Sequence, residues 1–211
     1  MKIAVLIGSP KGAKSTSFRL FKELQGLVNG EHECQELILD NPEVSAAGLQ
    51  AIAESDILIL SFPLYFDGIP GHFLACLPII AKMIENQKHK PTVYALVHAG
   101  FFEGKQCVNA IACCKNWVAG MAAIWGGGVG IGAGAALASL KQVALGQGKR
   151  KSLGVAFTAL AKAISDKRQV PDAYLSPDFP RFVYKLLVHR NWYASLKHHN
   201  LKRKDLYRRL P

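Results

Sequence analysis

The sequence predicts a three-layer α/β sandwich built on a five-stranded parallel sheet, followed by a helical extension. Two observations lead to this fold class. Short apolar runs rich in β-branched residues, typical of strands buried on both faces, alternate with segments whose apolar residues recur every three to four positions, as in helices. The chain has 211 residues, 50% of them hydrophobic and 19% charged, which is enough for one main folded domain.

Five segments are expected as strands and three as helices. Strand follows helix repeatedly along the chain, which calls for right-handed crossovers between parallel strands. The expected strands are residues 3–7, 34–39, 56–62, 92–98 and 120–125, of which the second has the weakest pattern. The expected helices cover residues 18–27, 73–84 and 108–118.

The last 33 residues differ in composition from the rest, so we divide the chain into an α/β domain at 1–178 and an extension at 179–211. The extension holds nine Lys and Arg against one Asp, which is most of the net charge of +11. Apolar residues, among them Phe182, Leu186 and Leu196, fall at helical spacing. We expect an amphipathic helix that docks on its own domain or on a second subunit, because nothing else in the sequence suggests nucleic acid or lipid.

Export and membrane insertion are not indicated. The apolar run at 3–7 is too short for a signal peptide. Residues 116–140 carry no charge and have the length of a membrane span, but seven glycines fall within them, and each costs a helix about 1 kcal/mol relative to alanine. We therefore expect no transmembrane helix.

The five cysteines are an odd number and include no C-x-x-C pair, so neither a disulfide framework nor a metal site is predicted. The seven histidines show no metal-binding spacing either. A reducing cytoplasmic location fits this use of cysteine.

In parallel α/β sheets ligands bind beyond the carboxyl ends of the strands, so the loops that follow the strands are the places to look for a site. The first of these loops reads GSPKGAKSTS and places Ser9, Ser15, Thr16 and Ser17 around a helix start, with Lys11 nearby. Hydroxyls, backbone N–H groups and the positive helix end favour a phosphate there. Two alternatives stay open. One is a nucleoside-triphosphate loop, whose second glycine is replaced by Ala13, and the other is simple helix capping by Ser15.

The loop after the third expected strand places Pro63, Leu64, Tyr65 and Phe66 at a strand end. Large apolar groups are seldom exposed unless something covers them, and a flat ring system would do so. Packing under a neighbouring loop or a partner subunit would serve equally well.

Taken together, GSPKGAKSTS, DILILSFPLYFDGIPGHF, GFFEG and WGGGVGIG resemble the NAD(P)H-dependent FMN reductase and iron-sulfur flavoprotein group, over about residues 1–165. The resemblance implies a flavodoxin-like fold with strand order 2-1-3-4-5. It also implies that Ser9, Lys11, Ser15, Thr16 and Ser17 bind the FMN phosphate. The isoalloxazine would lie against Pro63, Leu64, Tyr65 and Phe66, and against His98, Ala99, Gly100 and Phe101.

The activity implied by the resemblance is an FMN-dependent NAD(P)H oxidoreductase that passes hydride from NADH or NADPH to FMN and on to a quinone, flavin or other small acceptor. No catalytic acid or base is expected, and a homo-oligomer is. Two departures stand out: Lys11 replaces the family's common arginine, and the iron-sulfur cysteines are absent. A flavodoxin-like electron carrier, or an interaction protein that keeps only the fold, remain alternatives.

Residues 128–133 also satisfy the dinucleotide pattern G-x-G-x-x-A. The pattern requires an acidic residue about 20 positions later, and none occurs between Glu103 and Asp166. We therefore expect this glycine-rich segment to form a flexible rim of the site or a close-packed loop, not a nucleotide fingerprint.

Overall fold

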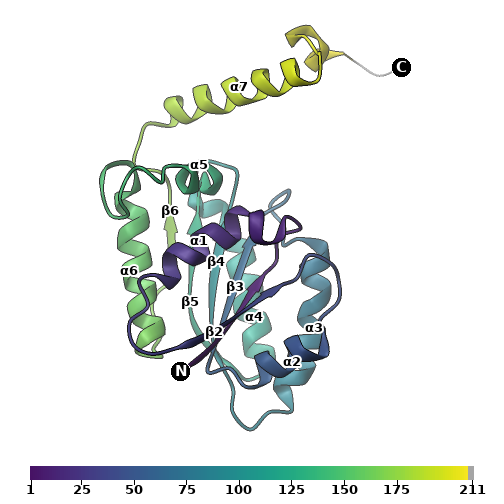
Figure 1. Ribbon diagram of the computed structural model, residues 1–211, viewed down its shortest axis with the longest axis vertical. Helices are drawn as coiled ribbons and strands as arrows, with labels where there is room; N and C mark the ends of the chain where they lie inside the picture. The colour runs from purple at the N-terminus through teal and green to yellow at the C-terminus, as the bar shows by residue number, and fades with distance from the viewer. Residues whose placement is uncertain (209–211) are drawn as a thin grey trace. The chain divides into compact units, whose positions relative to one another are not determined.

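Six parallel strands form one sheet in the order β2-β1-β3-β4-β5-β6 (Figure 1). They belong to a computed structural model that describes residues 1–208, and the three final residues of the expected extension lie outside it. The chain divides into two compact units, Met1–Asp178 and Phe179–Pro211, and the sheet lies in the first. The strands are β1 (Lys2–Ile7), β2 (Glu33–Ile38), β3 (Ile57–Pro63), β4 (Thr92–His98), β5 (Ile124–Ile131) and β6 (Ala173–Leu175).

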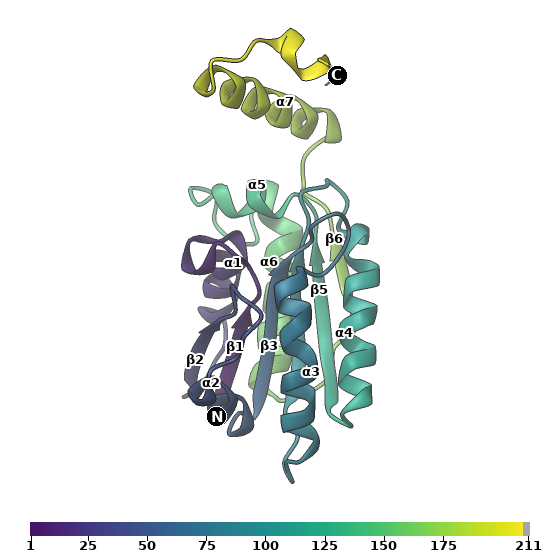
Figure 2. The ribbon, with the colours of Figure 1, turned by 90° about the vertical axis from the view of Figure 1, so that its right-hand side faces the viewer.

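Helices cover both faces of this sheet, as the two ribbon views show (Figures 1 and 2). One layer contains α1 (Thr16–Gln25), α5 (Gly134–Ser139) and α6 (Lys151–Ser165), and the other contains α2 (Ala46–Ala53), α3 (Gly71–Glu85) and α4 (Val108–Gly120). Short 3-10 turns occur at Gly12–Lys14, Gly104–Cys107 and Gly148–Arg150. The predicted three-layer α/β sandwich is confirmed.

The core lies around the central strands. Every residue of β3 and β4 is buried, because both strands are covered by helices on both faces. Strand β2 lies at the edge of the sheet, where Cys34 and Leu37 are partly buried and its other residues are exposed. Phe62 and Phe73 pack with ring centroids 5.2 Å apart and link β3 to α3. The first four predicted strands are each confirmed to within one residue.

The fifth strand was predicted at residues 120–125, and this is wrong, because β5 spans Ile124–Ile131 and contains most of the glycine-rich segment expected as a loop. Close packing explains the glycines. A Cβ on Gly126 would lie 2.4 Å from the Tyr94 ring, and one on Gly130 would lie 2.7 Å from Cβ of Cys107. Neighbouring side chains already fill the space that larger residues in β5 would need.

The sheet has six strands and not the predicted five. Strand β6 has only three residues, too few to show a period, and it pairs with the end of β5. Asp172 fastens this addition, since its carboxylate accepts hydrogen bonds from Trp125 Nε1 at 3.0 Å and from the Gly128 N–H at 2.8 Å.

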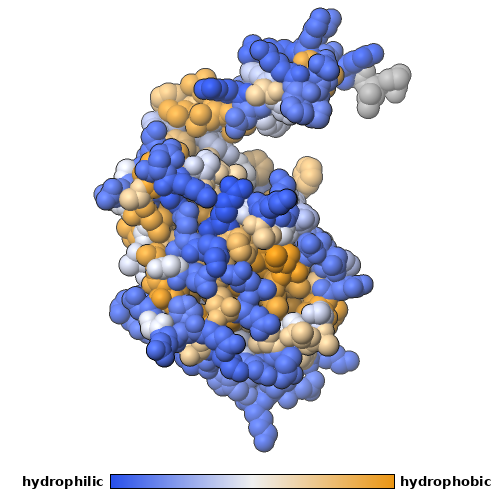
Figure 3. All heavy atoms as spheres, in the orientation of Figure 1, coloured by the Kyte–Doolittle hydropathy of each residue, from blue (hydrophilic) through white to orange (hydrophobic). Residues whose placement is uncertain are grey.

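The second unit is built on helix α7 (Arg181–His198), which is followed by a 3-10 turn at Arg203–Tyr207. No α7 residue is buried, and Phe182 and Leu186 are each 66% exposed. Apolar spheres gather over the first half of the helix (Figure 3). Leu187 and Trp192 are five residues apart and so point to different sides of the helix. The single apolar stripe expected of an amphipathic helix is therefore not formed.

Within residues 1–208, none of the helices has both the length and the apolar character needed to cross a bilayer. The uncharged segment 116–140 is divided among α4, β5 and α5.

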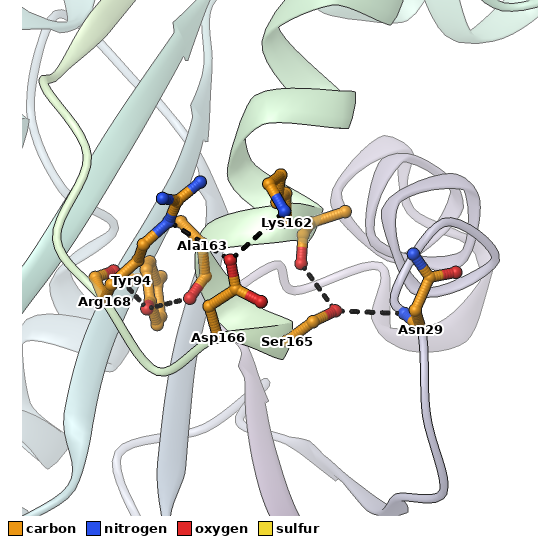
Figure 4. A network of polar contacts seen from close by, with 8 residues as sticks. Asn29, Tyr94, Lys162, Ala163, Ser165, Asp166 and Arg168 are labelled. Carbon is orange, nitrogen blue, oxygen red and sulfur yellow. Dashed lines mark hydrogen bonds and ion pairs between the residues drawn. The ribbon is translucent and has the colours of Figure 1, made fainter.

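A polar network lies at the end of the sheet opposite the loops that follow the strands (Figure 4). The buried hydroxyl of Tyr94 lies 2.9 Å from the Ala163 carbonyl and 2.7 Å from the Arg168 carbonyl, so β4 is tied to the end of α6. Asp166 pairs with both Lys162 and Arg168 around it. Burial raises the pKa of Tyr94 to about 12, so the hydroxyl keeps its proton at neutral pH.

We expect Tyr94→Phe to lower the free energy of unfolding by about 1–3 kcal/mol, because the Ala163 and Arg168 carbonyls lose the one hydroxyl proton that they share while the ring stays. Urea denaturation measures this change. Tyr207→Phe is the matched control, since Tyr207 is 84% exposed and its change should leave the midpoint in place. Equal midpoints for the two variants would contradict the role assigned to the Tyr94 hydroxyl.

Candidate functional site

The loop between β1 and α1 is folded around its own hydroxyls. Ser15 caps α1, since its Oγ accepts a hydrogen bond from the Phe18 N–H at 3.1 Å. Ser9 is buried, and its Oγ accepts from the Lys11 N–H at 3.4 Å. The first-turn N–H groups of Thr16 and Ser17 have no carbonyl within the helix to bond. With the exposed Lys11 beside them, they form an end of α1 that favours an anion.

Ser17 faces the interior and not the loop surface. It is fully buried, and its Oγ lies 3.0 Å from Nε2 of His98, at the end of β4. The hydroxyl of Ser61, a polar residue within the apolar strand β3, donates to the Ser17 carbonyl at 3.1 Å. The start of α1 is thereby bonded to two neighbouring strands.

The loop after β3 is a tight hairpin that presents two aromatic side chains. Tyr65 and Gly68 exchange two backbone hydrogen bonds of 3.0 Å, and the residues between them, Phe66 and Asp67, have φ values of 48° and 61°. This left-handed conformation is unusual for a bulky residue. Phe66 is fully exposed and Tyr65 is 45% exposed, while the preceding Pro63 and Leu64 are buried.

The loop after β4 begins buried and then emerges. His98 and Ala99 lie inside, and the Ala99 N–H donates to the Ile131 carbonyl at 2.8 Å. Gly100 and Phe101 lie outside, with Phe101 52% exposed. Burial lowers the pKa of His98 to about 4, so its ring is neutral at physiological pH.

These three loops meet at the edge of the sheet formed by the carboxyl ends of the strands, because β1, β3 and β4 are neighbouring parallel strands. The Leu64 N–H donates to the His98 carbonyl at 2.8 Å, which joins the second loop to the third. Among the predicted site residues, those at least partly exposed at this edge are Lys11, Thr16, Tyr65, Phe66, Gly100 and Phe101, and those buried beneath them are Ser9, Ser15, Ser17, Pro63, Leu64, His98 and Ala99.

Two contributors were not predicted from the sequence. Ser61 lies in a segment predicted only as a strand, and its hydroxyl holds the Ser17 carbonyl. The signal for it is a single polar residue in an otherwise apolar run. Gly134 packs on the His98 ring so closely that a Cβ there would lie 2.6 Å from Cβ of His98. Nothing in the glycine-rich segment distinguished this position from its neighbours.

The described part of the chain, residues 1–208, gathers no group of three or more side chains suited to holding a metal ion. The carboxyl edge of the sheet holds the start of α1, which favours an anion, and the exposed aromatic rings of Tyr65, Phe66 and Phe101. It can hold a ligand that has a negatively charged group at one end and a flat apolar body at the other.

Comparison with solved structures places the first unit in the flavodoxin-like fold. An NADH:FMN oxidoreductase (EMOB, apo form) aligns with a TM-score of 0.62 and 15% identity, over 80% of this chain and 90% of that one. A WrbA-like flavodoxin from Agrobacterium tumefaciens gives 0.54 and 13%, over 80% and 98%. An NADPH-quinone reductase from P. pentosaceus gives 0.53 and 15%, over 76% and 98%.

These structures belong to the flavodoxin-like NAD(P)H-dependent FMN reductase group that the sequence motifs resemble. No protein-family model matches the sequence, and a search of curated proteins gave no match. At such low identities the likeness establishes the fold, and the strand order 2-1-3-4-5 is extended by β6.

The hairpin at Phe66 yields a stability prediction. Phe66→Gly should be about 1 kcal/mol more stable than Phe66→Ala, because both lose the same exposed ring but only glycine adopts φ of 48° without strain. Thermal or urea unfolding of the two variants measures the difference. An alanine variant as stable as the glycine variant would show that the left-handed conformation carries no cost.

Proposed function

We propose that the protein is an FMN-dependent NAD(P)H oxidoreductase. The strongest support is the position of the start of α1, which follows β1 and favours an anion. It lies at the same end of the sheet as the exposed aromatic side chains in the loops after β3 and β4. FMN has a phosphate at one end and a flat ring system at the other. The names of the structural neighbours, which include NADH:FMN and NADPH-quinone reductases, support the same class.

The residues present fit such a cofactor. Lys11 and Thr16, with the N–H groups at the start of α1, would hold the phosphate, while Ser9 and Ser15 shape the loop around it. Tyr65, Phe66 and Phe101 would cover the isoalloxazine, above the buried Pro63, Leu64 and Ala99 and beside the Gly100 backbone. When bound, FMN would supply the hydride-transfer chemistry between a nicotinamide and a small acceptor such as a quinone. The protein's task is then to bind and orient, which needs no catalytic acid or base.

FMN binding is the first test of this proposal. Wild-type protein should quench FMN fluorescence saturably, and Ser15→Ala should weaken binding by about 1–3 kcal/mol if the capped loop holds the phosphate. Ser45→Ala is a matched control, because Ser45 caps α2 in the same way, accepting from the Gly48 N–H at 3.1 Å. ATP displacing FMN, or no saturable binding at all, would overturn the proposal in favour of a nucleotide loop or a protein that keeps only the fold.

Reduction by a nicotinamide tests the enzymatic part. Mixing FMN-loaded protein anaerobically with NADH or NADPH should bleach the flavin absorbance, and a quinone should restore it with ping-pong kinetics. The stopped-flow trace separates the two half-reactions. If the flavin binds but neither nicotinamide bleaches it, the protein is an electron carrier and not an oxidoreductase.

We also propose a cytoplasmic homo-oligomer. Support for the cytoplasm comes from five cysteines that are all free. Support for assembly comes from α7, whose Phe182, Leu186 and Trp192 are each more than 60% exposed. A second copy would cover these side chains.

Deletion of residues 179–211 tests this assembly. Because residues 1–178 form a compact unit of their own, the truncated protein should fold but contain fewer subunits per particle in light scattering than the full chain. An unchanged number of subunits, together with sedimentation of the full-length protein on anionic vesicles, would instead assign the basic unit to a membrane surface.

A further inference from the structure

A buried hydrogen bond joins two of the three loops at the candidate site. Ser17 is 0% exposed and His98 is 8% exposed, and their Oγ and Nε2 atoms lie 3.0 Å apart. Ser17 stands in the first turn of α1, and His98 ends β4. The bond therefore spans from the anion-favouring end of the helix to the strand that leads to Phe101.

The His98 ring is held on more than one side. Gly134, the first residue of α5, lies so close that a Cβ there would be 3.0 Å from Nδ1, and its N–H donates to the Ala99 carbonyl at 3.0 Å. Ser61 also donates its hydroxyl to the Ser17 carbonyl, which helps to fix the residue that the ring contacts. The ring has little freedom to turn away from Ser17.

A neutral histidine suits this position chemically. Burial keeps the ring uncharged, so one nitrogen donates and the other accepts. A serine hydroxyl can either donate or accept, and so the bond forms with either tautomer. A buried hydroxyl or ring nitrogen left without its partner would be unfavourable, which keeps the two groups together.

We propose that His98 is a positioning residue that, through Ser17, fixes the first turn of α1 relative to the end of β4. This inference rests on the proposed function for its ligand, because the two ends so fixed are those that would hold the phosphate and the ring system of FMN. His98 and Ser17 face inward, and we assign neither of them a contact with the ligand.

The Ser17–His98 bond should affect which flavins bind most tightly. Helix ends fray more readily than helix interiors, and the Ser15 cap acts only within the helix itself. The link to β4 adds a contact from outside the helix. Without it the phosphate-binding end would shift relative to the aromatic side chains, and a ligand that must reach both would lose more affinity than a ligand that reaches only the aromatic side chains.

Riboflavin, which lacks the phosphate, provides the comparison. We expect His98→Phe and Ser17→Ala to raise the Kd for FMN about tenfold, while the Kd for riboflavin stays within about twofold. His98→Gln, which keeps a polar group near the position of Nε2, should recover most of the FMN affinity. The double variant His98→Phe/Ser17→Ala should be no weaker than either single variant, because both changes remove the same bond.

Tyr94→Phe is the control for general destabilisation, since it removes a buried hydrogen bond at the other end of the sheet and should leave the ratio of the two Kd values unchanged. Equal losses for FMN and riboflavin in His98→Phe, or no loss for either, would overturn the proposal.

A measurement without ligand keeps the inference separate from the proposed function. If wild-type protein fails to bind FMN, the proposed function fails, but amide hydrogen exchange of the ligand-free protein still tests the link. Faster exchange in His98→Phe confined to residues 18 and 19, whose N–H groups bond to Ser15, would support the positioning role. Exchange unchanged there, or faster across the whole sheet, would overturn it.

Discussion

The register of three buried strands is the constraint on which the candidate site depends. Ile7 of β1 pairs with Ser61 of β3, and Pro63 of β3 pairs with His98 of β4, so the loops that follow begin side by side. Neighbouring strands are about 4.8 Å apart, which places the end of β1 within about 10 Å of the end of β4. A slip in this register would separate the anion-favouring helix end from the aromatic side chains.

Much of the fold could be predicted because its central strands are apolar on both faces. Such continuous apolar runs can be recognised as strands from the local sequence alone. The exceptions have physical causes. Strand β5 contains glycines that pack against Tyr94 and Cys107, so their reason for being glycine lies in contacts distant in sequence. Strand β6 has three residues and is held by Asp172, whose partners Trp125 and Gly128 lie more than 40 positions away. Local patterns contain neither contact.

For the candidate site, the sequence predicted which loops follow the ends of β1, β3 and β4 but not the direction of each side chain. The motif around Ser15 predicted a helix start with hydroxyls, and the capped turn of α1 agrees with that expectation. Nothing local showed that Ser17 faces inward to His98, or that Phe66 stands on a left-handed turn. Both depend on how separate loops pack, which a pattern of residue types does not encode. The same packing divides the hydroxyl residues of the first loop into two groups. Thr16 is partly exposed, and Ser9, Ser15 and Ser17 are buried beneath the surface of the loop.

The most direct test of the central claim is to locate the ligand on the protein. Titrating FMN into isotope-labelled protein and following backbone amide resonances should shift those of residues 11–18, 65–68 and 99–101, which lie on three different loops, and leave those near Tyr94 and Ala163 unchanged. Shifts confined to one loop, or gathered at the groove lined by Trp125 and Asp172, would contradict a flavin site at the carboxyl edge of the sheet.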